Sequence, residues 1–240
     1  MSGRDGHVAL VTGAGTGIGA ATARLLAKRG MHLALAGRRR ELLEETSHAI
    51  EALGARALVV AGDLADPAFP HRLVDETVRT LGRLDVLVNN GATIAVGPLD
   101  GFTLEQIDRH LAVNTRAPLL LTQEATPALT DSPDGAIVNV SSSVGSIVKP
   151  GNGLYGMTKA ALEYLTRASA YELAGRRIRV NCVARDPFGR RFTKSGRTTS
   201  KPRTPTSRAA SHSAEWQSRR RSPSGSGRSS TRRPPGPLAT

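Results

Sequence analysis

Six short apolar runs divide the first 184 residues, and segments with helical periodicity lie between them. The runs lie at about residues 7–13, 32–37, 57–63, 84–90, 136–142 and 178–184. Each run is apolar on both faces, as strands require when helices cover both sides of a sheet. Strands that alternate with helices in this way are joined by right-handed crossovers and form a parallel sheet. The sequence therefore predicts an α/β fold, a doubly wound parallel sheet with helices on both faces.

The first run leads into a glycine-rich turn. His7-Val-Ala-Leu-Val-Thr12 is followed by Gly13-Ala-Gly15-Thr-Gly17-Ile-Gly19 and then by a helical pattern over residues 20–29. Glycines let the backbone turn sharply and approach a ligand, and the first N–H groups of a helix attract a pyrophosphate. The spacing G-x-x-x-G-x-G differs from the common dinucleotide-binding G-x-G-x-x-G. Such a turn can be a plain loop, but the strand before it and the helix after it favour a nucleotide site.

A tyrosine and a lysine lie four residues apart in Tyr155-Gly-Met-Thr-Lys159, and Ser142 precedes the tyrosine by thirteen residues. Positions i and i+4 share one face of a helix, so the Lys159 ammonium can lie near the Tyr155 ring. A phenol ordinarily titrates near pH ~10, and a cation about 4 Å away at an effective dielectric of ~20 lowers its pKa by up to about 3 units before solvent screening. The spacing is also that of two residues on an exposed helix face. With Ser142 and the glycine-rich turn, it predicts a phenol that exchanges protons near neutral pH.

A series of short motifs occurs in a fixed order between about residues 7 and 184. They are Thr12-Gly13-x-x-x-Gly17-Ile18-Gly19, Asn89-Asn90-Gly91-Ala92, Asn114, Ser142, Tyr155 and Lys159. Together they resemble the short-chain dehydrogenase/reductase family, and within it the 3-oxoacyl-[acyl-carrier-protein] reductases. The resemblance implies a Rossmann-like domain over residues 1–184. It also implies an NADP(H)-dependent oxidoreductase that interconverts a carbonyl and an alcohol on a small molecule.

The resemblance assigns roles to residues. Tyr155 is the proton donor or acceptor, Lys159 lowers the pKa of Tyr155 and holds the nicotinamide ribose, and Ser142 binds the substrate oxygen. Asn114 supports a water molecule in a proton relay, and Asp63 with Leu64 resembles the pair that contacts the adenine ring. The implied cofactor-binding residues are Gly13, Thr16, Gly17, Ile18, Gly19, Arg38, Asp63, Leu64, Asn90, Tyr155 and Lys159.

One departure from the family pattern follows the fourth run. The family usually has Asn-Asn-Ala-Gly, whereas this chain has Asn89-Asn90-Gly91-Ala92. The exchange moves by one place the residue that tolerates a positive φ. We interpret it as a tolerated variant.

The end of the second run bears on the choice of cofactor. A carboxylate there would bond a ribose 2′-hydroxyl and repel a 2′-phosphate. Instead the run ends in Gly37, followed by Arg38-Arg39-Arg40, whose guanidinium groups can hold a phosphate. A solvated charge run at the start of a helix is the alternative, although cations are unfavourable there. The sequence favours NADP(H) over NAD(H).

The composition changes at residue 185. The net charge of +13 would suggest a nucleic-acid partner, but residues 1–184 carry 19 Lys and Arg against 18 Asp and Glu, whereas residues 185–240 carry 14 against 2. In the second part Leu238 is the only Leu, Ile or Val. Such a segment cannot bury enough apolar surface to offset its ordering entropy. We therefore predict a basic, disordered tail over 185–240 and do not expect nucleic acid as the partner.

A change of reading frame explains this tail. With permitted codons, Arg185 to Arg190, read one base earlier, becomes Pro-Gly-Pro-Val-Arg-Ala, which the family resemblance predicts after Ala184. In the same frame, Ala209 to Ser222 becomes Arg-Ile-Pro-Leu-Gly-Arg-Val-Ala-Glu-Pro-Glu-Glu-Ile, which resembles the family's stretch before its last helix. We predict that one base is missing near codons 184 and 185. The domain would then lack its last helix and strand, and the run 178–184 would become an exposed sheet edge.

The remaining features carry little functional signal. Cys182, the single cysteine, lies in an apolar run and is predicted to be inert core, and one thiol suits a reducing cytosol. The histidines lack metal-ligand spacing, so no metal site is predicted. No apolar run reaches ~18 residues and no signal peptide is recognisable, which favours a cytoplasmic protein. The family resemblance implies a homo-oligomer, which the altered tail puts in question here.

Two other functions remain open at this point. One is a catalytically inactive remnant that still binds nucleotide, which the tail as written favours. The other is a protein that uses the basic tail on nucleic acid or on anionic surfaces.

Overall fold

A computed structural model describes residues 6–185 of the chain. The expectations of a disordered tail and of a shifted frame fall on residues outside the described part. Within residues 6–185, no helix combines the length and the apolar content that crossing a bilayer requires.

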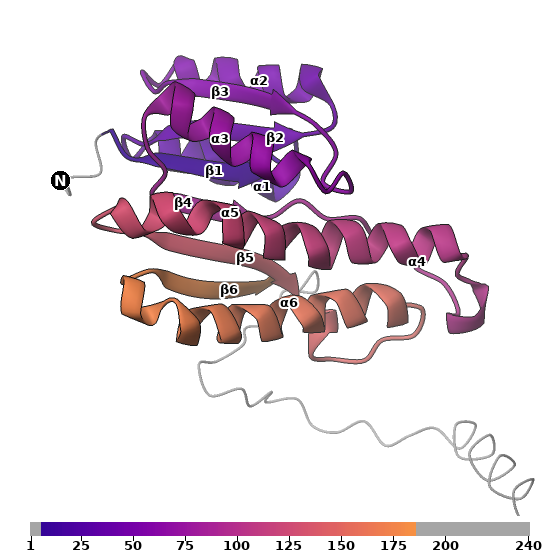
Figure 1. Cartoon of the computed structure of the whole chain (residues 1–240). Coiled ribbons are helices and arrows are strands. Elements are labelled where there is room, and N and C mark those ends of the chain that lie inside the picture. Colours follow the sequence, from indigo (N-terminus) through magenta and orange to yellow (C-terminus); the bar gives the residue numbers. More distant parts are fainter. Residues whose placement is uncertain (1–5, 186–240) are drawn as a thin grey trace, which may run out of the picture. The chain divides into compact units, whose positions relative to one another are not determined.

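Six parallel strands form one sheet in the order β3-β2-β1-β4-β5-β6 (Figure 1). The strands are β1 (Val8–Thr12), β2 (His32–Gly37), β3 (Ala57–Ala61), β4 (Val86–Asn89), β5 (Ala136–Ser142) and β6 (Arg179–Arg185). The helices are α1 (Gly17–Ala27), α2 (Arg40–Glu51), α3 (Phe69–Leu81), α4 (Leu104–Leu111), α5 (Ala117–Asp131) and α6 (Gly153–Glu172). Shorter helical turns are η1 (Leu99–Gly101), η2 (Ala112–Arg116), η3 (Ser143–Gly145) and η4 (Ala174–Arg176). The predicted doubly wound parallel sheet is confirmed.

Alternate residues of the central strand face two separate cores. On β1, Val8 and Leu10 belong to the cluster under α3 and α5, whereas Ala9 and Val11 belong to the cluster under α1 and α2. All four are fully buried. A strand buried on both faces has to be apolar throughout, which is why the period-2 alternation of a half-exposed strand is absent from this run.

The helical segment between β4 and β5 is divided into three pieces. Thr103 and Gln106 form a reciprocal capping box that starts α4, with Gln106 N donating to Thr103 Oγ1 at 3.2 Å. The chain then makes a π-helical turn, η2, before α5 begins. Pro118 lies in the first turn of α5 and has no N–H to donate to the carbonyl four residues earlier, that of Asn114. Pro127 lies inside α5 and does not end it. The π turn lies at the residue assigned to the proton relay.

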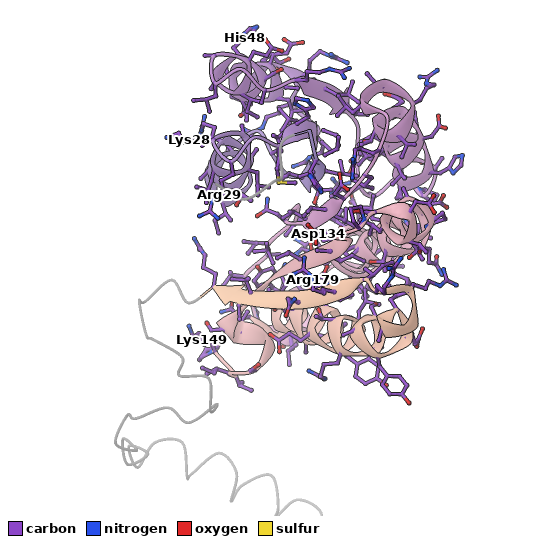
Figure 2. The ribbon with its side chains drawn as sticks, turned by 90° about the vertical axis from the view of Figure 1, so that its left-hand side faces the viewer. Lys28, Arg29, His48, Asp134, Lys149 and Arg179 are labelled. Carbon is purple, nitrogen blue, oxygen red and sulfur yellow. The ribbon has the colours of Figure 1, made fainter. Side chains whose placement is uncertain are left out.

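Strand β6 is the outer strand of the described sheet and pairs with β5 alone. Figure 2 shows Arg179, at its start, beside Asp134, whose carbonyl oxygen accepts a hydrogen bond of 3.4 Å from Arg179 Nη2. Val183 is 57% exposed, and Cys182 is half-buried rather than part of the core. The predicted open edge is therefore present within residues 6–185, and it reduces the burial expected for Cys182.

Candidate active site

The carboxyl ends of six strands open onto one cleft of ≈ 650 Å³. The residues that end or follow β1 to β6, in that order, and line the cleft are Gly13, Arg38, Asp63, Asn90, Ser142 and Arg185. Ligands of open α/β sheets bind at this edge, where the strand order reverses. Here the order reverses between β1 and β4. The cleft is therefore where the fold would hold a dinucleotide.

The glycine-rich turn forms a cradle at the start of α1. Gly13 and Gly17 have φ of +65° and +54°, in the left-handed region that residues with a Cβ rarely adopt. A Cβ on Gly19 would lie 2.2 Å from the carbonyl oxygen of Gly13, so glycine is needed for α1 to pack so closely on the turn. Thr16 precedes α1 without a side-chain cap, which leaves the first N–H groups of the helix available at the cleft. A pyrophosphate fits this cradle.

Thr12 and Asn90 join the glycine-rich turn to the end of β4. The Thr12 hydroxyl accepts hydrogen bonds from the backbone N–H groups of Asn90 and Gly91 at 3.0 and 2.9 Å. The side-chain amide of Asn90 in turn donates to the carbonyl oxygen of Thr12 at 2.8 Å. These bonds fix two strand ends that are more than seventy residues apart in the chain. They hold the floor of the cleft in one conformation.

Gly91 is distinguished by close contacts and not by an unusual φ. Its φ is not positive, and neither is that of Ala92. A Cβ on Gly91 would lie 2.6 Å from Leu64 Cδ1 and 3.3 Å from the backbone nitrogen of Gly13. The departure from Asn-Asn-Ala-Gly therefore moves a close contact and causes no backbone strain. The expectation that the exchange moves a position of positive φ was wrong, because neither residue has a positive φ.

Two arginines stand at the end of β2, where a carboxylate would discriminate against a 2′-phosphate. Gly37, Arg38 and Arg39 all line the cleft, and the Arg38 charge contributes to lowering the pKa of Asp63 across it. Arg40 instead lies outside the cleft lining and pairs with Glu44 at 3.5 Å on the exposed side of α2. The arginine run therefore divides into two residues that face the cleft and one that does not.

Asp63 pairs with an arginine that the sequence did not single out. Arg109, on α4, donates to both oxygens of Asp63 at 3.2 and 3.0 Å. Burial alone would raise the pKa of Asp63, but the hydrogen bond from Ala65 N and the Arg109 guanidinium hold that pKa below its ordinary value. Asp63 is therefore ionised and held rigidly at the end of β3. An ionised carboxylate can accept from an adenine amino group.

Ser142, Tyr155 and Lys159 line the cleft where β5 ends. Ser142 ends β5, and the other two lie in the first two turns of α6. The Ser142 hydroxyl is close enough to Tyr155 to act on the phenol, where it lowers the pKa. All three line the cleft. The sequence prediction that they share one site is consistent with this geometry.

Lys159 is hydrogen-bonded to strand β5 and lies near the Tyr155 ring. Its Nζ donates to the carbonyl oxygen of Val140 at 2.7 Å and lies 5.7 Å from the centre of the Tyr155 ring. Burial lowers the pKa of Lys159 to about 8. Burial likewise raises the pKa of Tyr155 above its ordinary value, and the Arg185 charge and the Ser142 hydroxyl offset only part of this. The expectation that Lys159 lowers the pKa of Tyr155 is wrong for this arrangement, because desolvation of the phenol exceeds the nearby charges.

Asn114 lies behind the cleft rather than in its wall. Its side chain is 1% exposed, accepts from Thr93 N at 2.8 Å and donates to Thr93 O at 2.9 Å. It also donates to the Thr158 hydroxyl at 3.1 Å, and Thr158 donates to the carbonyl oxygen of Tyr155. Asn114 therefore connects the segment after β4 to the helix that carries Tyr155.

Comparison with known proteins agrees with this site. A family model described as short chain dehydrogenase matches residues 7–200. The chain belongs to the short-chain dehydrogenase family. An uncharacterised oxidoreductase of Thermotoga maritima is 40% identical over 179 residues, which is 75% of this chain and 70% of the relative. This short-chain dehydrogenase is therefore an oxidoreductase of the class that acts on CH–OH groups, as predicted.

Solved structures of other short-chain dehydrogenases have the same fold. The enzyme of Burkholderia cenocepacia in complex with NADP is 39% identical with a TM-score of 0.72, over 75% of this chain and 74% of that one. Carveol dehydrogenase from Mycobacterium avium in complex with NAD is 27% identical with a TM-score of 0.72, over 77% and 72%. The fold thus accepts either nicotinamide cofactor in its relatives.

The cleft of this short-chain dehydrogenase contains most of the predicted site. The lining residues that the sequence indicated are Gly13, Thr16, Gly17, Ile18, Arg38, Asp63, Leu64, Asn90, Ser142, Tyr155 and Lys159. Asn114 and Gly19 are the exceptions, since both are buried directly behind the wall. Residues that the sequence did not indicate also line the cleft, among them Thr93, Ile94, Arg109, Val113, Lys149 and Asn152. Their positions depend on which loops meet above the sheet, and no local pattern marks them.

Proposed function

We propose that the protein is an NADP(H)-dependent oxidoreductase that interconverts a carbonyl and an alcohol, with Tyr155 as proton donor or acceptor. The observation that carries the proposal is the pair of Ser142 and Tyr155 hydroxyls at the β5 end of a cleft that also contains the glycine-rich cradle after β1. A bound nicotinamide would exchange a hydride with the carbonyl carbon at that end. The protein has to position the substrate oxygen and move one proton.

The two hydroxyls divide this work. Ser142 and Tyr155 can both donate to the substrate oxygen, which orients the carbonyl and stabilises the charge that develops on it. Because burial raises its pKa, Tyr155 keeps its proton at neutral pH and is ready to donate it in the direction of reduction. Lys159, whose pKa is about 8, remains largely charged at neutral pH. It is attached to β5 by its hydrogen bond to the carbonyl oxygen of Val140. Lys159 and Asp63 are the residues that would hold the nicotinamide ribose and the adenine.

The raised pKa of Tyr155 makes a prediction about pH. Alcohol oxidation requires the deprotonated phenol, so kcat/KM for oxidation should rise about tenfold per pH unit from pH 6 to pH 8. Reduction uses the protonated form, which predominates over this range, so its kcat/KM should stay level. Lys159 loses its charge as the pH approaches and passes its own pKa of about 8, which sets the upper limit of the test. Initial rates in both directions check this, and a pH-independent oxidation rate would contradict it.

The two arginines after β2 support NADP(H) as the cofactor. Arg38 and Arg39 line the cleft, and no carboxylate stands at the end of β2 to repel a 2′-phosphate. The similar Burkholderia enzyme was solved with NADP, which agrees with this choice. A guanidinium on a phosphate is a charge-assisted, often bidentate contact.

Replacing Arg38 with Ala should therefore weaken NADPH binding roughly 10- to 100-fold and change NADH binding little. Arg40→Ala is the matched control, because Arg40 carries the same charge but lies outside the cleft lining and pairs with Glu44. Calorimetric titration of the three proteins with both nucleotides measures the difference. Equal affinity of the parent protein for NADPH and NADH would refute the assignment.

The activity itself is tested with small carbonyl compounds. NADPH consumption is followed with a 3-oxoacyl thioester, which the resemblance to 3-oxoacyl-[acyl-carrier-protein] reductases suggests, and with aliphatic and aromatic ketones. The full-length chain and a restored-frame chain, with one base inserted between codons 184 and 185, are measured in parallel. NADPH binding without turnover of any substrate by either chain would instead favour the nucleotide-binding remnant.

The remnant is the second candidate, and one observation favours it. Strand β6 is the edge of the described sheet, so residues 6–185 supply no wall of the cleft beyond β6. We propose that a missing base near codons 184 and 185 accounts for the sequence beyond that strand.

A cytoplasmic location and a homo-oligomer of the restored-frame chain remain predictions. Binding of the basic tail to nucleic acid would appear as salt-dependent retention on DNA that is lost on deleting residues 185–240.

A further inference from the structure

A glutamate on α6 holds the segment that carries Ser142. Glu163 follows Lys159 by one helical turn, and its two carboxylate oxygens accept hydrogen bonds from two serines. Ser141 Oγ donates to Oε1 at 2.9 Å, and Ser146 Oγ donates to Oε2 at 2.9 Å. The two serines lie on either side of Ser142 and of the turn η3. One carboxylate thus connects both ends of this segment to the helix of Tyr155.

The segment between the two serines lies directly on α6. A Cβ on Gly145 would lie 2.7 Å from Glu163 Oε1 and 3.1 Å from backbone atoms of Lys159 and Ala160. On the helix side, a Cβ on Gly156 would lie 2.7 Å from the carbonyl oxygen of Val144. Two glycines therefore allow backbone to approach backbone, and the contact leaves no space for a different path of η3.

The hydrogen-bonding chemistry suits a fixed attachment. A serine hydroxyl has one proton to donate in a hydrogen bond, and a carboxylate has two oxygens that accept, so Glu163 accepts a hydrogen bond from each serine. Hydrogen bonds to a charged acceptor are shorter and stronger than bonds between neutral groups. Ser141 is 3% exposed, so its hydroxyl would be left buried without a strong partner if Glu163 were truncated. Its other acceptor, the carbonyl oxygen of Lys159, is 3.5 Å away.

We propose that Glu163 is a positioning residue for the carbonyl–alcohol reaction. By holding Ser141 and Ser146 it fixes Ser142 relative to Tyr155, which stands on the same helix. The inference rests on the proposed function, because it assigns to Glu163 the alignment of the two hydroxyls that meet the substrate oxygen. Misplacement of a reacting group by about 1 Å can reduce a rate about 100-fold.

A double-mutant cycle in the full-length protein, in whichever of the two frames turns over, tests this role. Glu163→Ala should lower kcat roughly 10- to 100-fold and leave KM for NADPH nearly unchanged. In the Ser142→Ala background the same change should have little further effect, since the group that Glu163 positions is already gone. Independent, multiplicative effects of the two changes would overturn the proposal, because a general loss of structure is not confined to Ser142.

Two further variants separate position from charge. Glu163→Gln keeps the length of the side chain. Its amide can accept a hydrogen bond from one serine hydroxyl and donate one to the other, so the variant should keep most of the activity. A Gln variant as impaired as the Ala variant would overturn the proposal in favour of a charge effect on Lys159. Glu172→Ala, at the exposed end of the same helix, is the matched control and should behave as the parent.

Hydrogen exchange tests the attachment without any turnover. The Ser146 and Ile147 amides donate to the Ser143 carbonyl at 3.2 and 2.8 Å, and both should exchange at least tenfold faster in Glu163→Ala than in Glu172→Ala. Equal exchange in the two variants would overturn the inference about Glu163 by itself. Faster exchange with no reductase activity in any variant would instead count against the proposed function and leave the attachment standing.

Discussion

Tyr155→Phe is expected to reduce turnover by about 10²- to 10⁴-fold, the range that a general acid contributes, while NADPH affinity is retained. The substitution removes the exchangeable proton and keeps the ring volume. It also keeps the ring that lies 5.7 Å from Lys159 Nζ, so the packing around the lysine should persist. NADPH oxidation in the presence of substrate measures the loss, and fluorescence titration measures the affinity.

Tyr171→Phe provides the control for this experiment. Tyr171 lies near the end of α6 and is 87% exposed, so losing its hydroxyl should leave turnover at the parental value. A Tyr155→Phe protein that turned over as fast as Tyr171→Phe would end the proposed mechanism, whatever the glycine-rich cradle binds.

Two companion substitutions distinguish the partners of Tyr155. Ser142→Ala should lower turnover on the order of 10²-fold, as expected for the loss of one donor to a developing oxyanion. Lys159→Ala should reduce both turnover and NADPH affinity, because the lysine also supports the cleft through its bond to Val140. The ordering of these effects follows from position, since Ser142 meets Tyr155 and Lys159 lies beneath the ring.

The sequence was sufficient for features that local chemistry determines. The six apolar runs became six strands because each must be buried on both faces. The glycine-rich turn became a cradle because Gly13 and Gly17 adopt positive φ where other residues are strained. The third run ended early, at Ala61, and the following Gly62 lies so close to Phe69 that a Cβ there would be 2.2 Å from the ring. Boundaries of this kind depend on packing against residues several positions away.

The sequence was not sufficient for contacts between elements that are distant in the chain. The Asp63–Arg109 pair joins the end of β3 to α4, and nothing near either residue indicates the other. The Tyr155–Lys159 spacing predicted a shared face, which the structure has, but not that Lys159 would donate to Val140. The predicted shift in the pKa of Tyr155 had the wrong direction for the same reason. Burial by the surrounding chain exceeds the effect of one nearby cation, and burial cannot be read from a spacing.

Insertion of one base between codons 184 and 185 is expected to convert the chain into a more stable and more active enzyme. Within residues 6–185, strand β6 pairs on one side only, and Val183 is 57% exposed beside that open edge. The restored frame would continue Ala184 with Pro-Gly-Pro-Val-Arg-Ala, and by resemblance to the family it would supply the substrate lid, the last helix and a strand that pairs with the edge. Pairing that edge and burying the apolar surface should raise the thermal midpoint by several degrees, since roughly 1 kcal/mol shifts it by about 2–4 °C in a domain of this size.

The gain in turnover should exceed the gain in stability, because a lid excludes water and holds the substrate carbonyl against Ser142 and Tyr155. Inserting two bases at the same junction is the matched control, since it makes an equally local change but yields the third reading frame. Resequencing codons 180–190 decides the origin of the tail before any protein is made. A gene sequence in which no base is missing at this junction would contradict the proposal. A restored-frame protein no more active than the two-base control would contradict it as well. The Arg-Ser-Pro-rich sequence after β6 would then be the native continuation of the chain, and the nucleotide-binding remnant would become the better description.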